Sequence, residues 1–250
     1  MMAQLYSATF ACVDVETTGL NIKKDRVIEV AAVLFNGDRI VDEVSTLVDP
    51  QQEIPKSSQE IHNISEEMVR GQPTIGEVLP KVMALLGSHI IVGHGIQFDI
   101  GILCEEAARC RIPCTLNKNP FIDTLRLARL YGESPSNSLD VLRQHFNIQA
   151  EGAHRAHGDT LVNIQVFRHL TKRFSTTEEV FAALEKPIFM KNMPLGKHKG
   201  RPLREIPLDY LCWAARQEFD RDLLFSLRSE IARRKKGDTF GGAANPFQSL

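Results

Sequence analysis

The chain has 250 residues, and its 30 lysines and arginines nearly balance its 31 aspartates and glutamates. With 43% hydrophobic residues it can bury a sizeable core, which excludes collagen-like, coiled-coil and disordered proteins. There is no run of 18 apolar residues and no basic N-terminal region with a cleavage site. We therefore expect no membrane span, no signal peptide and a cytoplasmic location. The five cysteines are too sparse for a disulfide framework, so we expect them to be reduced.

The near-zero net charge is the sum of two opposed parts. Residues 1–185 carry 17 basic and 24 acidic side chains, a net of −7, whereas residues 186–250 carry 13 basic and 7 acidic, a net of +6. This asymmetry points to a polyanionic partner for the basic part. A basic surface that is merely solvated accounts for the charge equally well.

Strand patterns dominate the first 50 residues. Residues 9–16, TFACVDVE, alternate between two faces as a strand does. Two apolar runs, 27–35 and 40–48, flank Asn36-Gly37-Asp38, and Asn-Gly supplies the positive φ angles that a tight hairpin needs. We therefore expect a meander of three strands.

Beyond residue 75 the pattern becomes an alternation of helices and strands. Hydrophobic spacing predicts helices over 75–86, 98–108, 125–131, 138–146, 160–173 and 175–185, and short strands over 89–93 and 121–124. Lys186-Pro187 marks a domain boundary, followed by a Gly- and Lys-rich turn over 196–200 and by helices over 208–217 and 221–235. Residues 237–250 are expected to be disordered. There is no internal repeat.

Two of the acidic segments adjoin predicted strands. Asp14 and Glu16 share one face of an apolar strand, and buried carboxylates are tolerated when they bind a hard divalent cation. The alternative is a strand end that emerges into solvent at Glu16. Asp99 follows a short strand and begins a helix, where a carboxylate can also simply stabilise the helix dipole.

A third acidic segment precedes the helix predicted from Thr160. On a continuous helix, His154 and Asp159 would point some 140° apart, by about 100° per residue. Gly152 and Gly158 instead allow His154 to lie on a loop while Asp159 projects from the first helical turn. Taken alone, this segment is better explained by an ordinary helix-start Asp and a surface His.

Together and in this order, the segments resemble the DEDDh (DnaQ-like, proofreading-type) 3′–5′ exonuclease family. The resemblance covers about residues 7–172 and is specific because several spaced motifs recur in order. The matching segments are 13–20, 94–99 and 154–159, with further landmarks at 61–64 and 122–124.

Some positions depart from the family pattern without removing a ligand. Gly95 stands where the family usually has Asn, and His157 and Thr160 replace an apolar residue and Ala. Arg155 occupies the position of the tyrosine in the Tyr subclass, so the His subclass fits. We interpret His157 as a surface or capping histidine and Asp123 as the cap of the following helix.

The resemblance implies an α/β, ribonuclease H-like fold with a mixed five-stranded sheet flanked by helices. The expected organisation is an exonuclease domain at 7–173, a helix and linker at 174–187, a small basic C-terminal domain at 188–236 and the tail at 237–250.

The resemblance also assigns the site. It implies that two Mg²⁺ ions, or Mn²⁺ in their place, bind Asp14, Glu16, Asp99 and Asp159, and that His154 deprotonates the attacking water. The terminal nucleotide would contact Thr17, Thr18, Gly19, Leu20, His62 and Phe98.

The implied reaction is hydrolysis at the 3′ end of single-stranded DNA, with release of nucleoside 5′-monophosphates, in proofreading or repair. Two alternatives remain: trimming of RNA by the same core, and a proofreading subunit whose main task is docking to a polymerase or repair complex.

Residues 188–234 are similar to the small C-terminal domain of some exonuclease X-like proteins. Gly196 and Gly200 would shape a hairpin that displays the residues between them, and the predicted phosphate contacts are Lys197, Lys199 and Arg201. Protein docking is the alternative role. Tyr210 and Trp213 recur at helical spacing, and we interpret them as the core of this domain rather than as a base-stacking platform.

Overall fold

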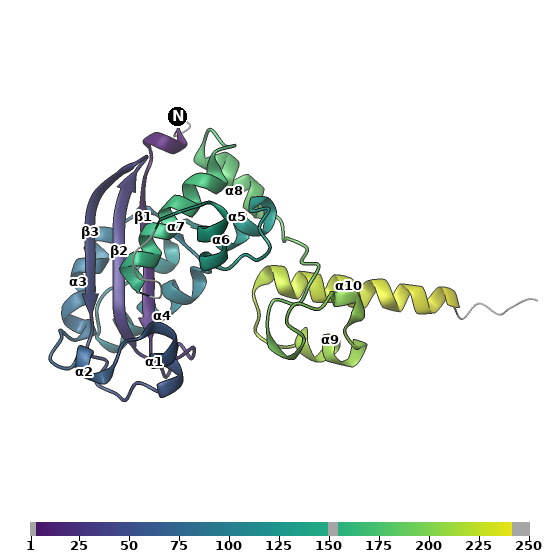
Figure 1. Cartoon of the computed structure of the whole chain (residues 1–250), viewed down its shortest axis with the longest axis horizontal. Coiled ribbons are helices and arrows are strands. Elements are labelled where there is room, and N and C mark those ends of the chain that lie inside the picture. The colour runs from purple at the N-terminus through teal and green to yellow at the C-terminus, as the bar shows by residue number, and fades with distance from the viewer. Residues whose placement is uncertain (1–3, 150–154, 242–250) are drawn as a thin grey trace, which may run out of the picture. The chain divides into compact units, whose positions relative to one another are not determined.

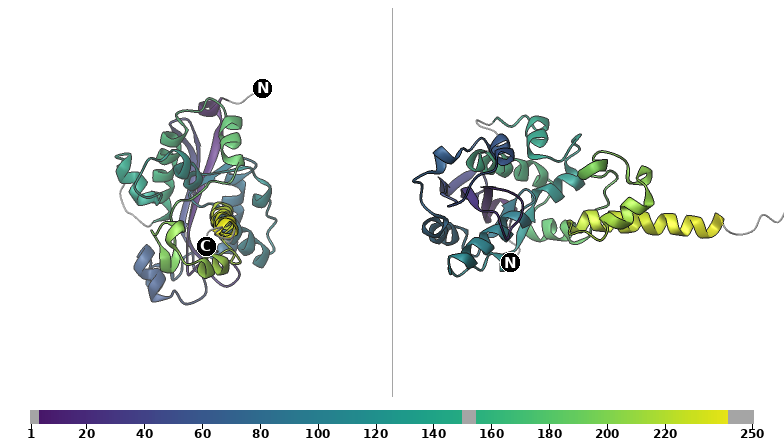
Figure 2. Two further views of the ribbon diagram at one scale, coloured as in Figure 1. Left: turned by 90° about the vertical axis from the view of Figure 1, so that its right-hand side faces the viewer. Right: turned by 90° about the horizontal axis from the view of Figure 1, so that it is seen from below.

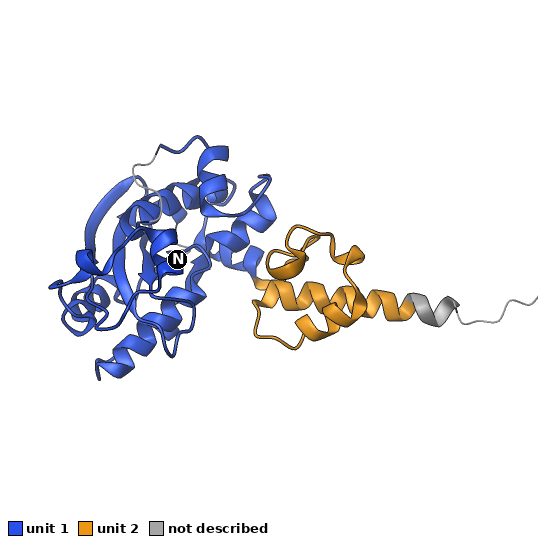
Figure 3. Cartoon of the chain, turned by 60° about the horizontal axis from the view of Figure 1, so that its bottom comes forward, with its two compact units in different colours: residues 1–184 blue, residues 185–250 orange. Residues whose placement is uncertain are grey.

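The computed structural model describes residues 4–149 and 155–241, and His154 lies outside this part of the chain. The chain divides into two compact units, Met1–Leu184 and Glu185–Leu250, which Figure 3 draws in blue and orange. The division falls within the 174–187 segment that the sequence suggested as helix and linker. Within the described residues, every helix is too short or too polar to cross a bilayer.

The first unit is built on a mixed five-stranded sheet in the order β3-β2-β1-β4-β5. Its strands are β1 (Thr9–Thr17), β2 (Val27–Asn36), β3 (Arg39–Leu47), β4 (Ile90–Gly93) and β5 (Phe121–Asp123). The first three strands pair antiparallel, and β4 and β5 continue the sheet parallel to β1. The predicted α/β fold with a mixed five-stranded sheet is confirmed.

Helices cover both faces of this sheet, as Figures 1 and 2 show. One hydrophobic core lies between the sheet and α3 and α4, and a second lies between the sheet and α5 to α8. The helices of this unit are α1 (Lys56–His62), α2 (Glu66–Val69), α3 (Ile75–Leu86), α4 (Gln97–Arg109), α5 (Thr124–Tyr131), α6 (Leu139–His145), α7 (Ala156–Thr171) and α8 (Thr177–Glu185). The sequence did not predict α1 and α2, which are short.

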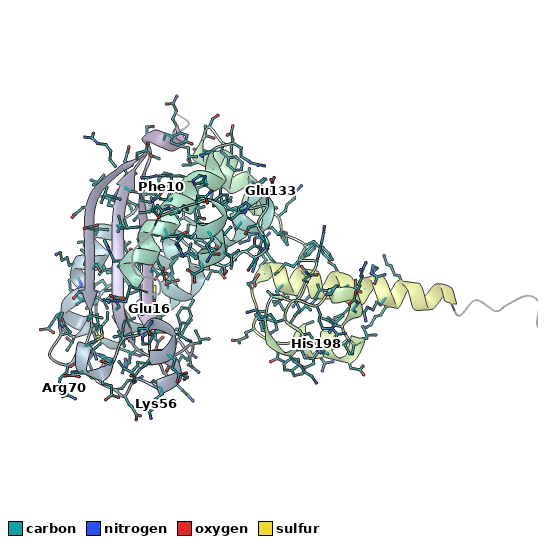
Figure 4. All side chains as sticks on the ribbon, viewed as in Figure 1. Phe10, Glu16, Lys56, Arg70, Glu133 and His198 are labelled. Carbon is teal, nitrogen blue, oxygen red and sulfur yellow. The ribbon has the colours of Figure 1, made fainter. Side chains whose placement is uncertain are left out.

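The alternation along β1 decides where its acidic residues point. Val13 and Val15 pack into the core with α3 and α4, whereas Phe10 packs into the core that contains α7. Because successive side chains of a strand point to opposite faces, Asp14 and Glu16 continue the Phe10 face toward α7. Figure 4 labels Phe10 near one end of β1 and Glu16 near the other.

Two local predictions need correction. In the hairpin, Asn36 is still paired with Arg39, and Gly37 supplies the positive φ angle of 51° at the turn. Helix α7 begins at Ala156, four residues before the predicted start at Thr160. The earlier start has a physical reason, because the Ala156 N–H donates to a Glu29 carboxylate oxygen at 2.9 Å and this distant residue caps the helix.

The second unit has its own small core. Its helices are α9 (Leu208–Ala214) and α10 (Arg221–Gly241), preceded by 3₁₀ turns at Gly196–His198 and Leu203–Glu205. Leu203, Leu211 and Leu227 are among the buried residues that form this core. Helix α10 extends to Gly241, past residue 237, from which the sequence analysis expected disorder. Residues 242–250 lie outside the described part.

Candidate active site

Three acidic side chains from distant parts of the chain meet at the end of β1. Asp14 and Glu16 lie on β1, and Asp159 lies in the first turn of α7. Each of the three residues has one carboxylate oxygen that lies within 4.8 Å of a carboxylate oxygen of the other two. Oxygen atoms at this spacing can share a hard divalent cation.

The fourth predicted ligand, Asp99, lies in the first turn of α4 and is buried. Its Oδ1 accepts the backbone N–H of Val15 at 3.1 Å, and Val15 separates Asp14 from Glu16 along β1. This hydrogen bond holds the start of α4 against the strand that carries two of the ligands. Asp99 thus adjoins the cluster of three without itself meeting the 4.8 Å spacing.

Burial, and after it the crowding of like charges, raises the pKa values of the carboxyl groups at this site. Burial, followed by repulsion from Asp99, Glu16 and Asp159, raises the pKa of Asp14 well above its ordinary value. Burial is the main cause that raises the pKa of Glu16 to about 7, and nearby carboxylates add to it. Burial likewise raises the pKa of Asp99 to about 7, although the Val15 N–H opposes the shift. The site cannot hold all of these charges at neutral pH without compensation, and divalent cations would supply it.

A buried ion pair beside this cluster was missed by the sequence analysis. Glu29 on β2 is opposite Glu16 in the β1–β2 ladder and only 3% exposed. Arg155 donates to its carboxylate through Nε, at 3.0 and 3.1 Å, and through Nη2 at 2.7 Å. Like charges opposite each other destabilise a sheet, so the guanidinium offsets this repulsion. The available signal was a single acidic residue within the apolar run VIEVAAVLF.

The loop after β1 is organised around Asp25. The Thr18 hydroxyl donates to Asp25 Oδ1 at 3.2 Å and accepts from the Gln52 side chain at 2.8 Å. A Cβ atom on Gly19 would lie 2.6 Å from an Asp25 oxygen, so a side chain at this position would displace the Asp25 carboxylate. Thr18 thus holds the loop together, since its N–H also donates to the Arg26 carbonyl at 2.9 Å and its carbonyl accepts the Ser58 hydroxyl at 2.8 Å. Leu20 projects into solvent and is 86% exposed.

His62 ends α1 with one ring nitrogen bonded and the other unpaired. Its Nδ1 accepts the Ile64 N–H at 3.0 Å, which requires the neutral ring to carry its proton on Nε2. Nε2 is buried and has no hydrogen-bond partner among the described residues. Burial lowers the pKa of His62, and the Glu29 charge opposes this shift. A buried donor without a partner calls for an explanation, and a substrate oxygen is one group that could pair with it.

Comparison with known proteins agrees with this geometry. The Exonuclease family profile matches residues 11–167. The chain belongs to the DnaQ-like 3′–5′ exonuclease family. The resemblance drawn from the motifs is therefore confirmed. A second profile, described as a putative quorum-sensing-regulated virulence factor, matches residues 183–227.

Individual relatives include a polymerase subunit, a polymerase and a nuclease of known structure. DNA polymerase III subunit epsilon of Aquifex aeolicus is 34% identical over 168 residues, 67% of this chain and 82% of that protein. The PolC-type DNA polymerase III of Clostridium perfringens is 38% identical over 67% of this chain, which spans only 11% of that polymerase. Exonuclease X, solved in complex with 5′ overhanging duplex DNA, is 25% identical with a TM-score of 0.55 over 70% of this chain and 99% of that chain.

In this exonuclease domain, Gly95 and Asp123 form one structural unit. Asp123 caps α5 by accepting the Leu125 N–H at 2.9 Å, as the sequence suggested, and also accepts the Gly95 N–H at 2.9 Å. Gly95 has a φ angle of 75°, in the left-handed region that Gly and Asn tolerate best. The backbone geometry thus accounts for Gly at a position where the family usually has Asn.

The remaining predicted residues of the exonuclease domain lie around this core. Phe98 is partly buried against the core shared with α3 and α4. His157 Nε2 lies 3.2 Å from a Glu43 oxygen near the surface. The predicted base, His154, lies outside the described residues, although its neighbour Arg155 is fixed by Glu29.

In the second unit the structure corrects two expectations. Lys197, Lys199 and Arg201 are exposed, but His198 between them is buried at 8% because its ring packs edge-on against Tyr210. Trp213, expected in the core, is 53% exposed. The helical spacing was recognised, but the face of α9 that turns inward carries Leu211 and Ala214 instead.

Proposed function

We propose that the protein is a divalent-metal-dependent exonuclease that hydrolyses phosphodiester bonds from the 3′ end of single-stranded DNA and releases nucleoside 5′-monophosphates. The observation that carries this proposal is the convergence of Asp14, Glu16 and Asp159 to within 4.8 Å, with Asp99 bonded to the same strand. The raised pKa values of Asp14, Glu16 and Asp99 agree with a metal site whose cations supply the missing counter-charge.

Two Mg²⁺ ions, or Mn²⁺ in their place, held by these four carboxylates would stabilise the attacking and leaving oxygens of an in-line displacement. Asp99 would be oriented for this role by its bond to Val15. We assign His154 as the base that takes the proton from the attacking water, because an imidazole titrates near neutral pH.

Positioning of the terminal nucleotide would fall to the groups around the carboxylates. The unpaired His62 Nε2–H would donate to a sugar or phosphate oxygen. The exposed Leu20 would pack against the terminal base from the Gly19 loop. Phe98, Thr17, Thr18 and Gly19 complete the proposed contacts.

DNA is the proposed substrate because exonuclease X was solved in complex with duplex DNA and the matched relatives are DNA polymerases or a subunit of one. The same relatives suggest that the protein acts in proofreading or repair, in association with a polymerase or repair complex. Labels at the 5′ and 3′ ends of the nucleic acid test the polarity of hydrolysis, and a comparison of DNA with RNA tests the substrate.

The experiment offers 5′-labelled and 3′-labelled single-stranded DNA and RNA with Mg²⁺ to the wild type and to Asp14→Asn. We expect the 5′ label to remain on a shrinking DNA ladder and the 3′ label to leave first as a mononucleotide. Asp14→Asn should be inactive, whereas Asp38→Asn, whose side chain is 94% exposed, should match the wild type. Shortening that needs no metal or survives Asp14→Asn contradicts the proposal, and faster cleavage of RNA reassigns the substrate.

A further inference from the structure

The second unit carries an exposed aromatic surface. The Trp213 ring on α9 is 53% exposed and lies 5.2 Å, between centroids, from the ring of Tyr210. Tyr210 in turn lies 4.5 Å from the ring of His198. The three rings form a row that runs from the buried His198 to the exposed Trp213. The exposed Trp213 therefore belongs to a cluster of rings and is not a single exposed residue.

The same row is bordered by cationic side chains. The 3₁₀ turn Gly196–His198 places Lys197 and Lys199 on the surface on either side of His198. A Cβ atom on Gly196 would lie 3.3 Å from the Tyr210 hydroxyl oxygen, so the turn lies close against that ring. Arg201 Nη1 lies 3.2 Å from His198 Nδ1. Aromatic and basic groups therefore gather around His198, and we call this set the aromatic–basic face: His198, Tyr210, Trp213, Lys197, Lys199 and Arg201.

The backbone holds this face in shape. The Met193 N–H donates to the Arg201 carbonyl at 2.9 Å, and the Gly200 N–H donates to the Met193 carbonyl at 2.7 Å, which closes the basic turn. On α9, Leu211 and Ala214 are buried in the small core and fix the opposite side of the helix. The rings are thus displayed by ordered structure, which lowers the entropy that binding must overcome.

We infer that the aromatic–basic face binds single-stranded nucleic acid, with Trp213 stacking on an unpaired base and Lys197 and Lys199 contacting the flanking phosphates. Stacking on aromatic rings combined with a cationic track is the usual chemistry of sequence-tolerant single-strand binding. The charge of the region agrees, since residues 186–250 carry 13 basic and 7 acidic side chains. The choice of nucleic acid as the ligand rests on the proposed function. The face is separate from the carboxylate cluster in the chain.

Trp213 provides its own probe because it is the only tryptophan of the chain. The full-length protein in EDTA, where hydrolysis is blocked, is titrated with an oligothymidylate of about 20 nucleotides while tryptophan emission is recorded. We expect saturable quenching that reverses when salt is added. Binding, seen by anisotropy of a labelled oligonucleotide, without any change in tryptophan emission would overturn the inference.

Variants measured by the same anisotropy assay separate the contacts. Trp213→Ala should weaken binding about tenfold, within the range of roughly 5- to 150-fold expected for one stacked base, and Trp213→Phe should lose less. Replacing Lys197 and Lys199 by Ala should reduce the dependence of log affinity on log salt by about 1.4. The matched control is Phe225→Ala, an aromatic of the same unit that is 41% exposed and lines a separate groove on α10.

The outcomes distinguish this inference from the proposed function. An unchanged affinity in Trp213→Ala, or an equal loss in Phe225→Ala, would overturn the aromatic–basic face. Hydrolysis of the p-nitrophenyl ester of thymidine 5′-monophosphate with Mg²⁺ should be the same in Trp213→Ala and the wild type, because this substrate has no second nucleotide. If the wild type fails to cleave this ester, the proposed function is in doubt, while the binding results still decide the inference.

Discussion

Removal of Arg155 should destabilise the exonuclease domain more than neutralisation of its partner. In Arg155→Ala, the Glu29 carboxylate stays buried opposite Glu16 and loses the hydrogen bonds of 2.7 to 3.1 Å that Arg155 makes with it. Breaking a buried ion pair in this way costs about 3–5 kcal/mol. The Arg155 side chain is 42% exposed, so solvent already screens part of the pair, and we expect a loss of about 2–3 kcal/mol.

Glu29→Gln perturbs the same pair from the other side. The neutral amide keeps an oxygen that can accept the Ala156 N–H, and the half-exposed Arg155 can return to water. Repulsion on Asp14 and Glu16 also falls, because the Glu29 charge contributes to their raised pKa values. We expect a loss of about 1 kcal/mol, near the net value of an ordinary hydrogen bond.

Urea unfolding in EDTA, followed by far-UV circular dichroism, measures both free energies. The only tryptophan lies in the second unit, so its fluorescence identifies that unit's transition separately. Arg143→Ala, which removes a partly exposed pair with Asp140 on α6, serves as the control and should cost no more than about 1 kcal/mol. The reasoning is refuted if Glu29→Gln destabilises the domain as much as Arg155→Ala does.

Two further predictions concern protonation and backbone geometry. Between about pH 6.5 and 7.5, the free energy of unfolding in EDTA should fall as pH rises, because the pKa values of Glu16 and Asp99, raised to about 7, leave the native state with more bound protons than the unfolded chain. Mg²⁺ should therefore raise the melting temperature more at the upper end of this window, and a metal effect that shrinks with pH would contradict the site. Gly95→Ala should lower the free energy of unfolding by about 1 kcal/mol because of the left-handed φ, whereas Gly95→Asn should cost about half of that or less. Equal losses in thermal or urea unfolding would show that the φ angle is not the cause.

Local periodicity was sufficient to predict most individual elements. The alternation in TFACVDVE predicted that Asp14 and Glu16 share a face, and helical spacing gave the bounds of α3 as the structure has them. Both signals depend on neighbouring residues alone. The assembly of the site from β1 and α7 has no such local signal, and it was expected only because the motifs resembled a family.

The errors have a common cause in contacts between distant residues. The start of α7 was placed too late because its cap comes from Glu29 on β2, far away in the sequence. Trp213 was assigned to the core because spacing reveals a helix but not which of its faces has a partner. His198 was expected on the surface, yet the Tyr210 ring covers it. Each of these depends on a neighbour that the one-dimensional pattern does not identify.

The central claim is that carboxylates from β1 and α7 form one catalytic metal site, and Asp159→Asn tests it most directly. The measurement is the Mg²⁺-dependent rate of shortening of a 5′-labelled single-stranded DNA, with the exposed Asp38→Asn as control. We predict that Asp159→Asn lowers this rate by about 100-fold or more, since even residues that only orient metal ligands are worth about 10- to 100-fold. A rate in Asp159→Asn close to that of the wild type would contradict the account.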